Sequence, residues 1–245
     1  MMPILEIKNI SKHFGGIKAL DGTNIKIEKG KIIAIIGPNG SGKTTLFDVI
    51  SNLVNKDEGE IYLDKEEISE NEDFEIAKKG ISRTFQNVRL FRNLTIKDHL
   101  EIALGDDDEK LLKSLFSKKE DNDRRIKKIL DLVGLNKNFD TLATDLSFGQ
   151  RKLLDLAVAI AKPHSILMLD EPVAGINPQL RGSIKDILRK LNKEGETILV
   201  IEHDMNFVMD LADYVYVLDY GKVIAEGGPK EIQNNKKVLE AYLGE

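Results

Sequence analysis

The chain alternates between short apolar runs and longer amphipathic segments. Three runs are continuously apolar, at Lys31–Ile36, Ile166–Leu169 and Thr197–Ile201. Strands that are covered on both faces have this composition, which is typical of a parallel sheet. Helical patterns separate the runs, and one of them, Pro178–Leu191, begins with a proline, a residue favoured in the first turn of a helix. Buried strands that alternate with helices predict an α/β fold.

Other segments alternate apolar and polar residues one by one. Ile4–Ile10 and Thr23–Glu28 have this period of two, which is typical of a strand with one buried face. Gly59–Asp64 is a further candidate strand, and Gly221–Gly227, after the apolar run Tyr214–Leu218, predicts a hairpin. The chain therefore combines buried strands with half-exposed strands of a second kind.

The middle of the chain, residues 94–161, has helical patterns and no evident strand. Its segments Gly105–Glu109 and Lys118–Arg125 are densely charged, which is typical of solvated helix faces and a loop. We interpret residues 94–161 as a helical subdomain that is inserted into a single domain. On this interpretation residues 1–93 and 162–245 form the α/β core together with its β subdomain.

Composition narrows the class of protein. The 245 residues are 41% hydrophobic and 31% charged, with a formal net charge of −5 and no cysteine. The negative charge argues against a general nucleic-acid binder, and the lack of cysteine excludes disulfides and thiolate metal sites. No apolar run reaches the roughly 18 residues that span a bilayer, and the start of the chain has no basic stretch before an apolar core. We expect a cytoplasmic protein that reaches a membrane only through a partner.

The first candidate site follows the apolar run Lys31–Ile36. Residues Gly37–Thr44 match the spacing G-x-x-x-x-G-K-[ST], a loop that wraps backbone N–H groups around nucleotide phosphates. Lys43 is then placed to reach the β- and γ-phosphates, and the Thr44 hydroxyl to ligate Mg²⁺. The alternative, a Gly-rich turn without a ligand, is disfavoured by the strand–loop–helix context. The nucleotide-binding residues expected here are Gly37, Pro38, Asn39, Gly40, Ser41, Gly42, Lys43, Thr44 and Thr45.

A second candidate site ends the apolar run Ile166–Leu169, where Asp170 and Glu171 follow. Ligands bind at the carboxyl ends of the strands in open α/β sheets. There Asp170 would hold Mg²⁺ beside Thr44, and Glu171 would be the general base that orients the attacking water. Without the phosphate loop, the same pair would be interpreted as an exposed acidic turn after a core strand.

A third motif indicates the family. Leu146–Gln150, with the sequence LSFGQ, resembles the LSGGQ signature of ATP-binding-cassette (ABC) ATPases. Ser147 and Gly149 would open a helix, so that backbone donors and a hydroxyl face an anion. The resemblance implies that Ser147, Gly149 and Gln150 contact the γ-phosphate of ATP that is bound to another subunit. In isolation the pentapeptide would only predict a capped amphipathic helix.

The order of the motifs along the whole chain also resembles the cassette family. The resemblance implies that Gln86 is the Q-loop glutamine, which contacts Mg²⁺ or water, and that His203, at the end of a strand, contacts the γ-phosphate. Phe14 lies where the family places an aromatic that stacks on adenine, although an aromatic after a strand is also a candidate core residue. The implied fold of residues 1–245 is a P-loop NTPase (RecA-like) core with a small antiparallel β subdomain and an inserted α-helical subdomain.

Two departures from the family pattern point to one of its branches. Phe148 stands where the signature usually has glycine, and the turn Ala174–Pro178 contains Asn177 in place of the commoner aspartate. Asn177 keeps a side-chain oxygen, so it can still accept a hydrogen bond across a dimer interface. Both features resemble the branch that powers branched-chain amino-acid importers, as do Arg83–Phe91 and the ending Ala241–Glu245.

This resemblance implies an ATP-hydrolysing subunit of a membrane importer, with ATP and Mg²⁺ as ligands. The implied partners are a second ABC ATPase subunit, identical or homologous, in a head-to-tail dimer, two transmembrane permease subunits and, indirectly, a solute-binding protein. The implied location is the cytoplasmic face of the membrane. Residues 87–94, after the Q-loop, would help to form the permease groove, with ordinary packing as the alternative.

Other functions remain open at this point. Within transport, lipid or lipopolysaccharide export and urea or amide import use similar ATPases. A soluble cassette that acts on ribosomes, DNA or cluster assembly is a further alternative, although the two cassettes or long coiled coils of such proteins are not seen. A small-molecule kinase or GTP switch would leave LSFGQ and His203 unexplained.

Overall fold

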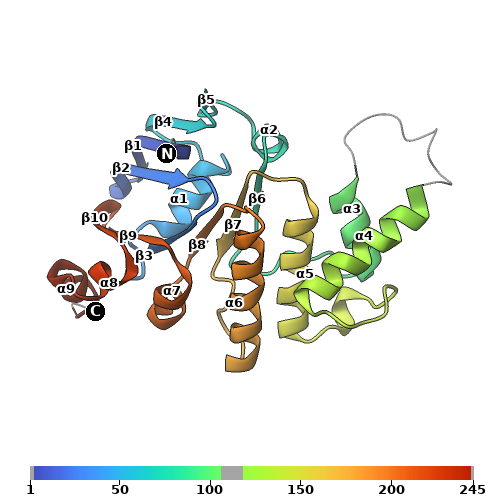
Figure 1. The fold of residues 1–245 in the computed structure, drawn as a ribbon. Helices are drawn as coiled ribbons and strands as arrows, with labels where there is room; N and C mark the ends of the chain where they lie inside the picture. The colour runs from blue at the N-terminus through green and yellow to red at the C-terminus, as the bar shows by residue number, and fades with distance from the viewer. Residues whose placement is uncertain (1–2, 106–117, 244–245) are drawn as a thin grey trace.

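The computed structural model describes residues 3–105 and 118–243, which form two β-sheets and the helices around them (Figure 1). The larger sheet has six strands in the order β10-β9-β3-β8-β7-β6, and the smaller has four in the order β2-β1-β4-β5. The strands are β1 (Pro3–Phe14), β2 (Ile17–Glu28), β3 (Ile32–Ile36), β4 (Glu58–Leu63), β5 (Glu66–Glu67), β6 (Ile81–Arg83), β7 (Ile166–Asp170), β8 (Ile198–Ile201), β9 (Tyr214–Asp219) and β10 (Lys222–Gly227). The helices are α1 (Lys43–Ile50), α2 (Asp73–Lys78), α3 (Ile96–Leu104), α4 (Lys118–Val133), the 3-10 helix η1 (Ala143–Asp145), α5 (Phe148–Ala161), α6 (Pro178–Lys193), α7 (Met205–Leu211), α8 (Pro229–Gln233) and α9 (Lys236–Leu243).

The larger sheet contains the three apolar runs as its central strands. β3, β8 and β7 are parallel neighbours, and every residue of each is buried. Alternate residues face opposite sides, so Ile32 and Ala34 join one hydrophobic cluster while Ile33 and Ile35 join another. The predicted α/β class with a parallel sheet covered on both faces is therefore confirmed.

The smaller sheet is antiparallel, and α1 packs between it and the larger sheet (Figure 1). β1 and β2 are longer than the alternating segments predicted. Bulges between Ile7 and Lys12 shift the pairing register, and such shifts interrupt the period of two that reveals a strand. The hairpin predicted near the end of the chain is formed by β9 and β10.

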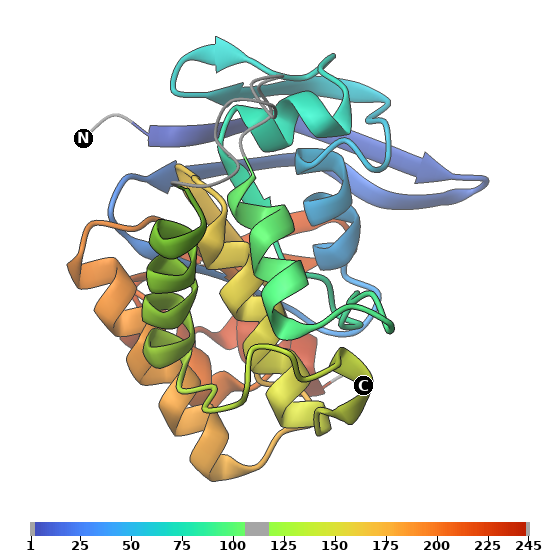
Figure 2. The ribbon, with the colours of Figure 1, turned by 90° about the vertical axis from the view of Figure 1, so that its right-hand side faces the viewer.

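Helices α3, α4 and α5 pack together at the right of Figure 1, and in Figure 2 they face the viewer below the strands of the smaller sheet. No strand interrupts residues 94–105 or 118–161, where only an isolated bridge joins Thr95 to Leu142. Most of the predicted charged loop, residues 106–117, lies outside the described residues. The subdomain boundaries at residues 93 and 161 stay a prediction. Within the described ranges, no helix combines the length and apolarity needed to cross a bilayer.

Candidate functional site

The topology of the larger sheet gathers the candidate residues at one edge. Strands β3, β8, β7 and β6 are consecutive parallel neighbours, so their carboxyl ends share that edge. The loop that begins at Gly37 follows β3, and His203 follows β8. Asp170 ends β7 with Glu171 after it, and Gln86 lies three residues beyond β6. Segments that are far apart in the sequence thus form one candidate site.

The phosphate loop leads directly into α1. Gly42 has a φ of 104°, and a Cβ there would lie 2.3 Å from a backbone oxygen of β2, so the turn requires glycine. No side chain of the described residues caps the start of α1, and the N-terminus of a helix is a favourable place for an anion. Lys43 is buried, and its Nζ donates to the carbonyl oxygens of Gly37 and Pro38, both at 2.8 Å. Thr44 is exposed in the first turn.

Glu171 lies between two of the other predicted residues. The Gln86 Nε2 donates a hydrogen bond of 3.0 Å to Glu171 Oε2, and His203 Nδ1 lies 3.7 Å from Oε1. Glu171 has a φ of 49°, a left-handed conformation that turns the chain out of β7 immediately after Asp170. The structure thus brings Gln86, Glu171 and His203 together, with Gln86 beside one oxygen of the carboxylate and His203 beside the other.

Asp170 is the buried carboxylate of the site, with 1% of its surface exposed. Desolvation raises its pKa, and the nearby Arg83 opposes that shift. Its Oδ1 is buried and lacks a hydrogen-bond partner among the described residues. A buried oxygen without a partner fits an oxygen-seeking cation such as Mg²⁺. No cluster of three His, Asp or Glu side chains able to hold a metal occurs in residues 3–105 and 118–243, so phosphate and water oxygens would complete the coordination.

Arg83 is a site residue to which the sequence analysis assigned no role. Its guanidinium donates to Ser51 Oγ at 2.8 Å and lies 2.8 Å from Asp48 and 3.5 Å from Asp170. The ring of Phe85 lies 4.9 Å from the guanidinium carbon. Arg83 therefore links α1 to the end of β7 and balances the charge of two carboxylates. Its place three residues before Gln86 is the signal that the sequence carries.

Two more buried charged side chains were also missed. Lys152 of α5 is 5% exposed, and its Nζ donates to the carbonyl oxygens of Gln86 at 3.3 Å and Glu171 at 3.0 Å. Glu202 is fully buried and accepts hydrogen bonds from the N–H groups of Val173 and His203. Desolvation raises the pKa of Glu202. Both side chains hold backbone segments that carry the candidate catalytic residues.

The signature segment opens α5 as predicted. Ser147 Oγ accepts a hydrogen bond from the N–H of Gln150, and Gln150 Oε1 accepts one from the N–H of Ser147. Phe148 is exposed and packs against Gly175, where an added Cβ would lie 3.2 Å from the ring. Gly149 lies against Leu180. These contacts tie the signature segment to the turn before α6 and to α6 itself, rather than to the phosphate loop.

Phe14 is not a core residue. It ends β1 at the tip of the hairpin with β2, it is 49% exposed, and Lys12 lies 5.5 Å from its ring centre. The same hairpin places Ala19 against Gly42 of the phosphate loop. The exposed part of the Phe14 ring is available to a flat ligand such as a nucleotide base.

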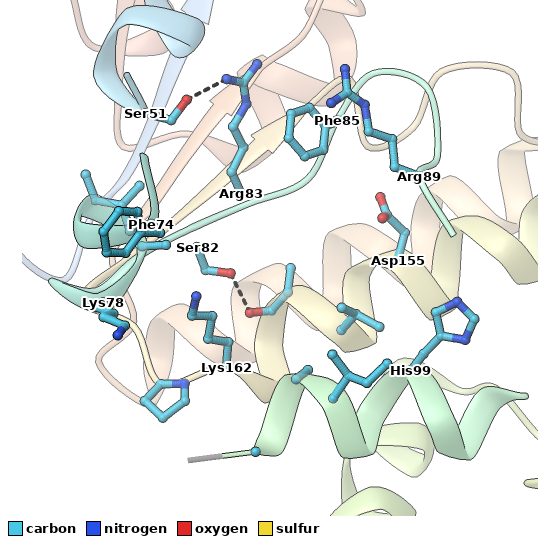
Figure 3. Close-up of a pocket in the computed structure, with 18 of the residues that line it drawn as sticks. Ser51, Phe74, Lys78, Ser82, Arg83, Phe85, Arg89, His99, Asp155 and Lys162 are labelled. Carbon is cyan, nitrogen blue, oxygen red and sulfur yellow. Dashed lines mark hydrogen bonds between the residues drawn. The ribbon is translucent and has the colours of Figure 1, made fainter. Parts of the chain in front are cut away.

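A groove beside the site has a volume of about 630 Å³ (Figure 3). It lies between α2 and β6 on one side and α3 and α5 on the other, and residues 89–91 contribute to its wall. Phe85 is stacked between Arg83 and Arg89, whose guanidinium carbon lies 3.9 Å from the ring centre. Phe91 is 63% exposed at the groove, and its N–H donates to His99 Nε2. The groove therefore presents aromatic and cationic groups that connect to the catalytic edge.

Comparison with known proteins identifies the family of the chain. The family model for ABC transporters matches residues 20–174, and the model for branched-chain amino acid ATP-binding cassette transporters matches residues 222–245. The probable branched-chain amino acid transport ATP-binding protein LivG of Archaeoglobus fulgidus is 40% identical over 99% of this chain and 96% of its own length. The protein of the same name from Methanocaldococcus jannaschii is 40% identical over 100% of this chain and 98% of its own.

Solved structures of ATP-binding cassettes are also similar to this chain. The ADP conformation of an ATP-binding cassette of an ABC transporter is 38% identical, with a TM-score of 0.86 and full coverage of both chains. A dimeric, post-hydrolysis cassette bound to ADP and phosphate is 28% identical, with a TM-score of 0.80 over 92% of this chain and 98% of its own. The predicted ABC ATPase fold is confirmed, as is the resemblance to the branched-chain amino-acid branch. The chain belongs to the nucleotide-binding ATP-binding cassettes of ABC transporters, a family of ATPases.

Proposed function

We propose that this chain is the ATP-hydrolysing subunit of a membrane importer for branched-chain amino acids. The arrangement of Gln86 and His203 around Glu171, at the edge of the sheet that also carries the phosphate loop, is the observation on which the proposal rests. The names of the relatives and the family match at residues 222–245 support the choice of cargo.

Each residue at this edge has a distinct role in the proposed reaction. The phosphate loop and Lys43 bind the phosphates of ATP, and Glu171 accepts a proton from the attacking water. Gln86 orients the water, and His203 contacts the γ-phosphate. Thr44, Asp170 and Gln86 are the side chains that would hold Mg²⁺, which supplies positive charge against the phosphate oxygens when it is bound. Phe14 stacks on the adenine.

The signature segment acts on the ATP of a second cassette. Ser147, Gly149 and Gln150 lie at the start of α5, and a helix start with a hydroxyl suits the γ-phosphate of the partner. ATP closes a head-to-tail pair of cassettes, because only the triphosphate bridges both surfaces, and hydrolysis lets them separate. The dimeric relative bound to ADP and phosphate supports this assembly.

The groove lined by Phe85, Arg89 and Phe91 receives a cytoplasmic segment of a permease. Its exposed aromatic and cationic side chains suit a helix that presents both apolar and polar groups. Two permease subunits would hold the cassettes at the cytoplasmic face of the membrane, and a solute-binding protein would deliver the amino acid on the other side. The stack of Arg83, Phe85 and Arg89 joins this groove to Asp170.

Reconstitution with the Glu171→Gln variant tests the proposal. The chain would be purified with its permeases, and leucine uptake into vesicles would be measured with ATP supplied on the cassette side. We expect the variant to bind ATP normally, while hydrolysis and uptake fall roughly 10²–10⁴-fold because the general base is lost. Unchanged hydrolysis would remove Glu171 from its role. ATP-dependent transport of a lipid or urea, with no leucine uptake, would assign a different cargo.

A further inference from the structure

Lys152 is a charged side chain in a place where a charge is unfavourable. It lies in α5, whose residues from Lys152 to Ala161 are mostly buried, and only 5% of its own surface is exposed. Desolvation lowers its pKa, against the opposing charges of Asp155, Glu202 and other carboxylates. A methionine of similar length would fill the space without the desolvation penalty, so packing alone does not explain a lysine here.

The contacts of Lys152 join three parts of the site. Its Nζ donates to the carbonyl oxygen of Gln86, at 3.3 Å, and to that of Glu171, at 3.0 Å. Glu171 has a left-handed backbone conformation. A residue other than glycine keeps this conformation when its surroundings hold it there. The helix that carries Lys152 begins at Phe148, directly after Ser147. One ammonium therefore connects the signature helix to the backbone of both residues at the reacting centre.

We propose that Lys152 is a positioning residue that holds Glu171 and Gln86 in place for ATP hydrolysis and links them to the signature helix of the same chain. In this role Lys152 acts through the carbonyl groups of Gln86 and Glu171. This inference rests on the proposed function, because it assumes that Glu171 is the general base. A small misplacement of a catalytic group is enough to lower a reaction rate about 10²-fold, so loss of this link is measurable.

Lys152→Met, tested in the full-length chain, removes the ammonium and keeps the length of the side chain. We expect kcat for ATP to fall roughly 10–100-fold, with the dissociation constant for ATP changed less than about twofold. Thermal unfolding of the nucleotide-free protein would be measured alongside. Lys185→Met, which removes the partner of Asp210 on the surface of α6, is the matched control. A wild-type kcat in Lys152→Met, or a loss of ATP affinity that parallels a loss of thermal stability, would overturn the proposal.

Chemical rescue gives a second, independent readout. The chain has no cysteine, so Lys152→Cys creates one unique thiol. Alkylation of the unfolded variant with bromoethylamine, followed by refolding, restores an ammonium at nearly the original length, whereas bromopropane gives a side chain of the same shape without the charge. We expect the aminoethyl form alone to regain most of the lost kcat. Equal rates for the two alkylated forms would refute a role for the charge.

Glu171→Gln, measured in parallel, separates this inference from the proposed function. If Glu171→Gln loses turnover while Lys152→Met keeps it, the positioning role fails and the function stands. If Glu171→Gln itself turns over normally, the assignment of the general base fails.

Discussion

The carboxyl group of Asp155 lies in the wall of the groove, where Figure 3 places it on α5 beneath Arg89. Burial raises its pKa from 3.8 to about 7, although Lys152 opposes the shift. The folded chain therefore holds a proton at Asp155 over a pH range in which the unfolded chain has released it. The stability from this group is fully present below the unfolded pKa of 3.8 and is lost as the pH rises through about 7.

Asp155→Asn removes this dependence on pH. We expect the unfolding free energy of the wild type to fall as the pH rises from about 5.5 to about 8.5. Over this range the wild type should lose about 1–2 kcal/mol more than the variant does. Urea unfolding at several pH values measures the difference, and Asp186→Asn, at an exposed carboxyl of α6, is the control. A constant difference between wild type and variant over this range would contradict the assignment.

Phe148 of the signature segment is in contact with the turn Ala174–Pro178, which carries the other departure from the family pattern. The ring of Phe148 packs over Gly175, which has a φ of 72° and no room for a larger side chain toward the ring. The aromatic ring in the signature segment thus favours a residue as small as glycine in the turn after Glu171. The sequence indicated Phe148 and the turn separately, but their contact depends on the packing of α5 against the start of α6, which no local pattern encodes.

The motifs predicted from spacing and those missed differ in how they depend on tertiary structure. The phosphate loop and the pair Asp170–Glu171 are local patterns, so the sequence predicted their places. Gln86 and His203 were assigned by resemblance alone, and their meeting at Glu171 depends on the strand order. Lys152 was assigned no role from the sequence, although a helix with so few charged residues is a signal that those charges are buried.

At the scale of elements, long buried strands and long helices were predictable and short elements were not. α6 was predicted to within two residues at its carboxyl end. β6 has three residues, too few for any period, and it exists because it pairs with β7. α2 escaped notice for the same reason, since its six residues complete fewer than two turns.

Asn177 is also the N-cap residue of α6. Its side-chain oxygen accepts a hydrogen bond of 2.9 Å from the N–H of Leu180 and so caps the helix. Asn177→Ala should lower the stability of the nucleotide-free chain by about 1 kcal/mol, or roughly 2–4 °C in Tm, as measured by thermal unfolding. Asn177→Asp keeps an acceptor and should unfold like the wild type. Equal Tm values for Asn177→Ala and the wild type would mean that the cap contributes nothing.

At the scale of the whole molecule, the chain carries two helix starts suited to anions, one at α1 and one at α5. The contacts of the signature segment run to the turn before α6 and to α6. In the proposed assembly, a second cassette brings its own signature segment to the nucleotide. The fold class and the sheet that positions the site were predictable from the apolar runs. The arrangement between subunits stays a prediction made by resemblance, because one chain contributes only half of each interface.

Ser147→Arg tests this assembly in a Glu171→Gln background, where ATP persists. The bulky cation should prevent the ATP-dependent dimer while the monomer still binds ATP, as size-exclusion chromatography and calorimetric titration would reveal. Ser147→Ala, which also loses the cap but adds no bulk, is the matched variant and should still dimerise. An ATP-dependent dimer of Ser147→Arg that elutes like that of the parent would contradict the proposed interface.

The reciprocal hydrogen bonds between Ser147 and Gln150 have a consequence for the resting protein. The N–H groups of Ser147 and Gln150 already have partners inside their own chain, so these two donors are not open to a neighbour in a cassette that stands alone. In the proposed assembly, a phosphate that binds the Ser147 N–H would displace the Gln150 oxygen, and the original hydrogen bond would reform when the phosphate leaves. This competition would weaken the binding of the phosphate and assist its release, which favours repeated cycles of association over a permanent dimer.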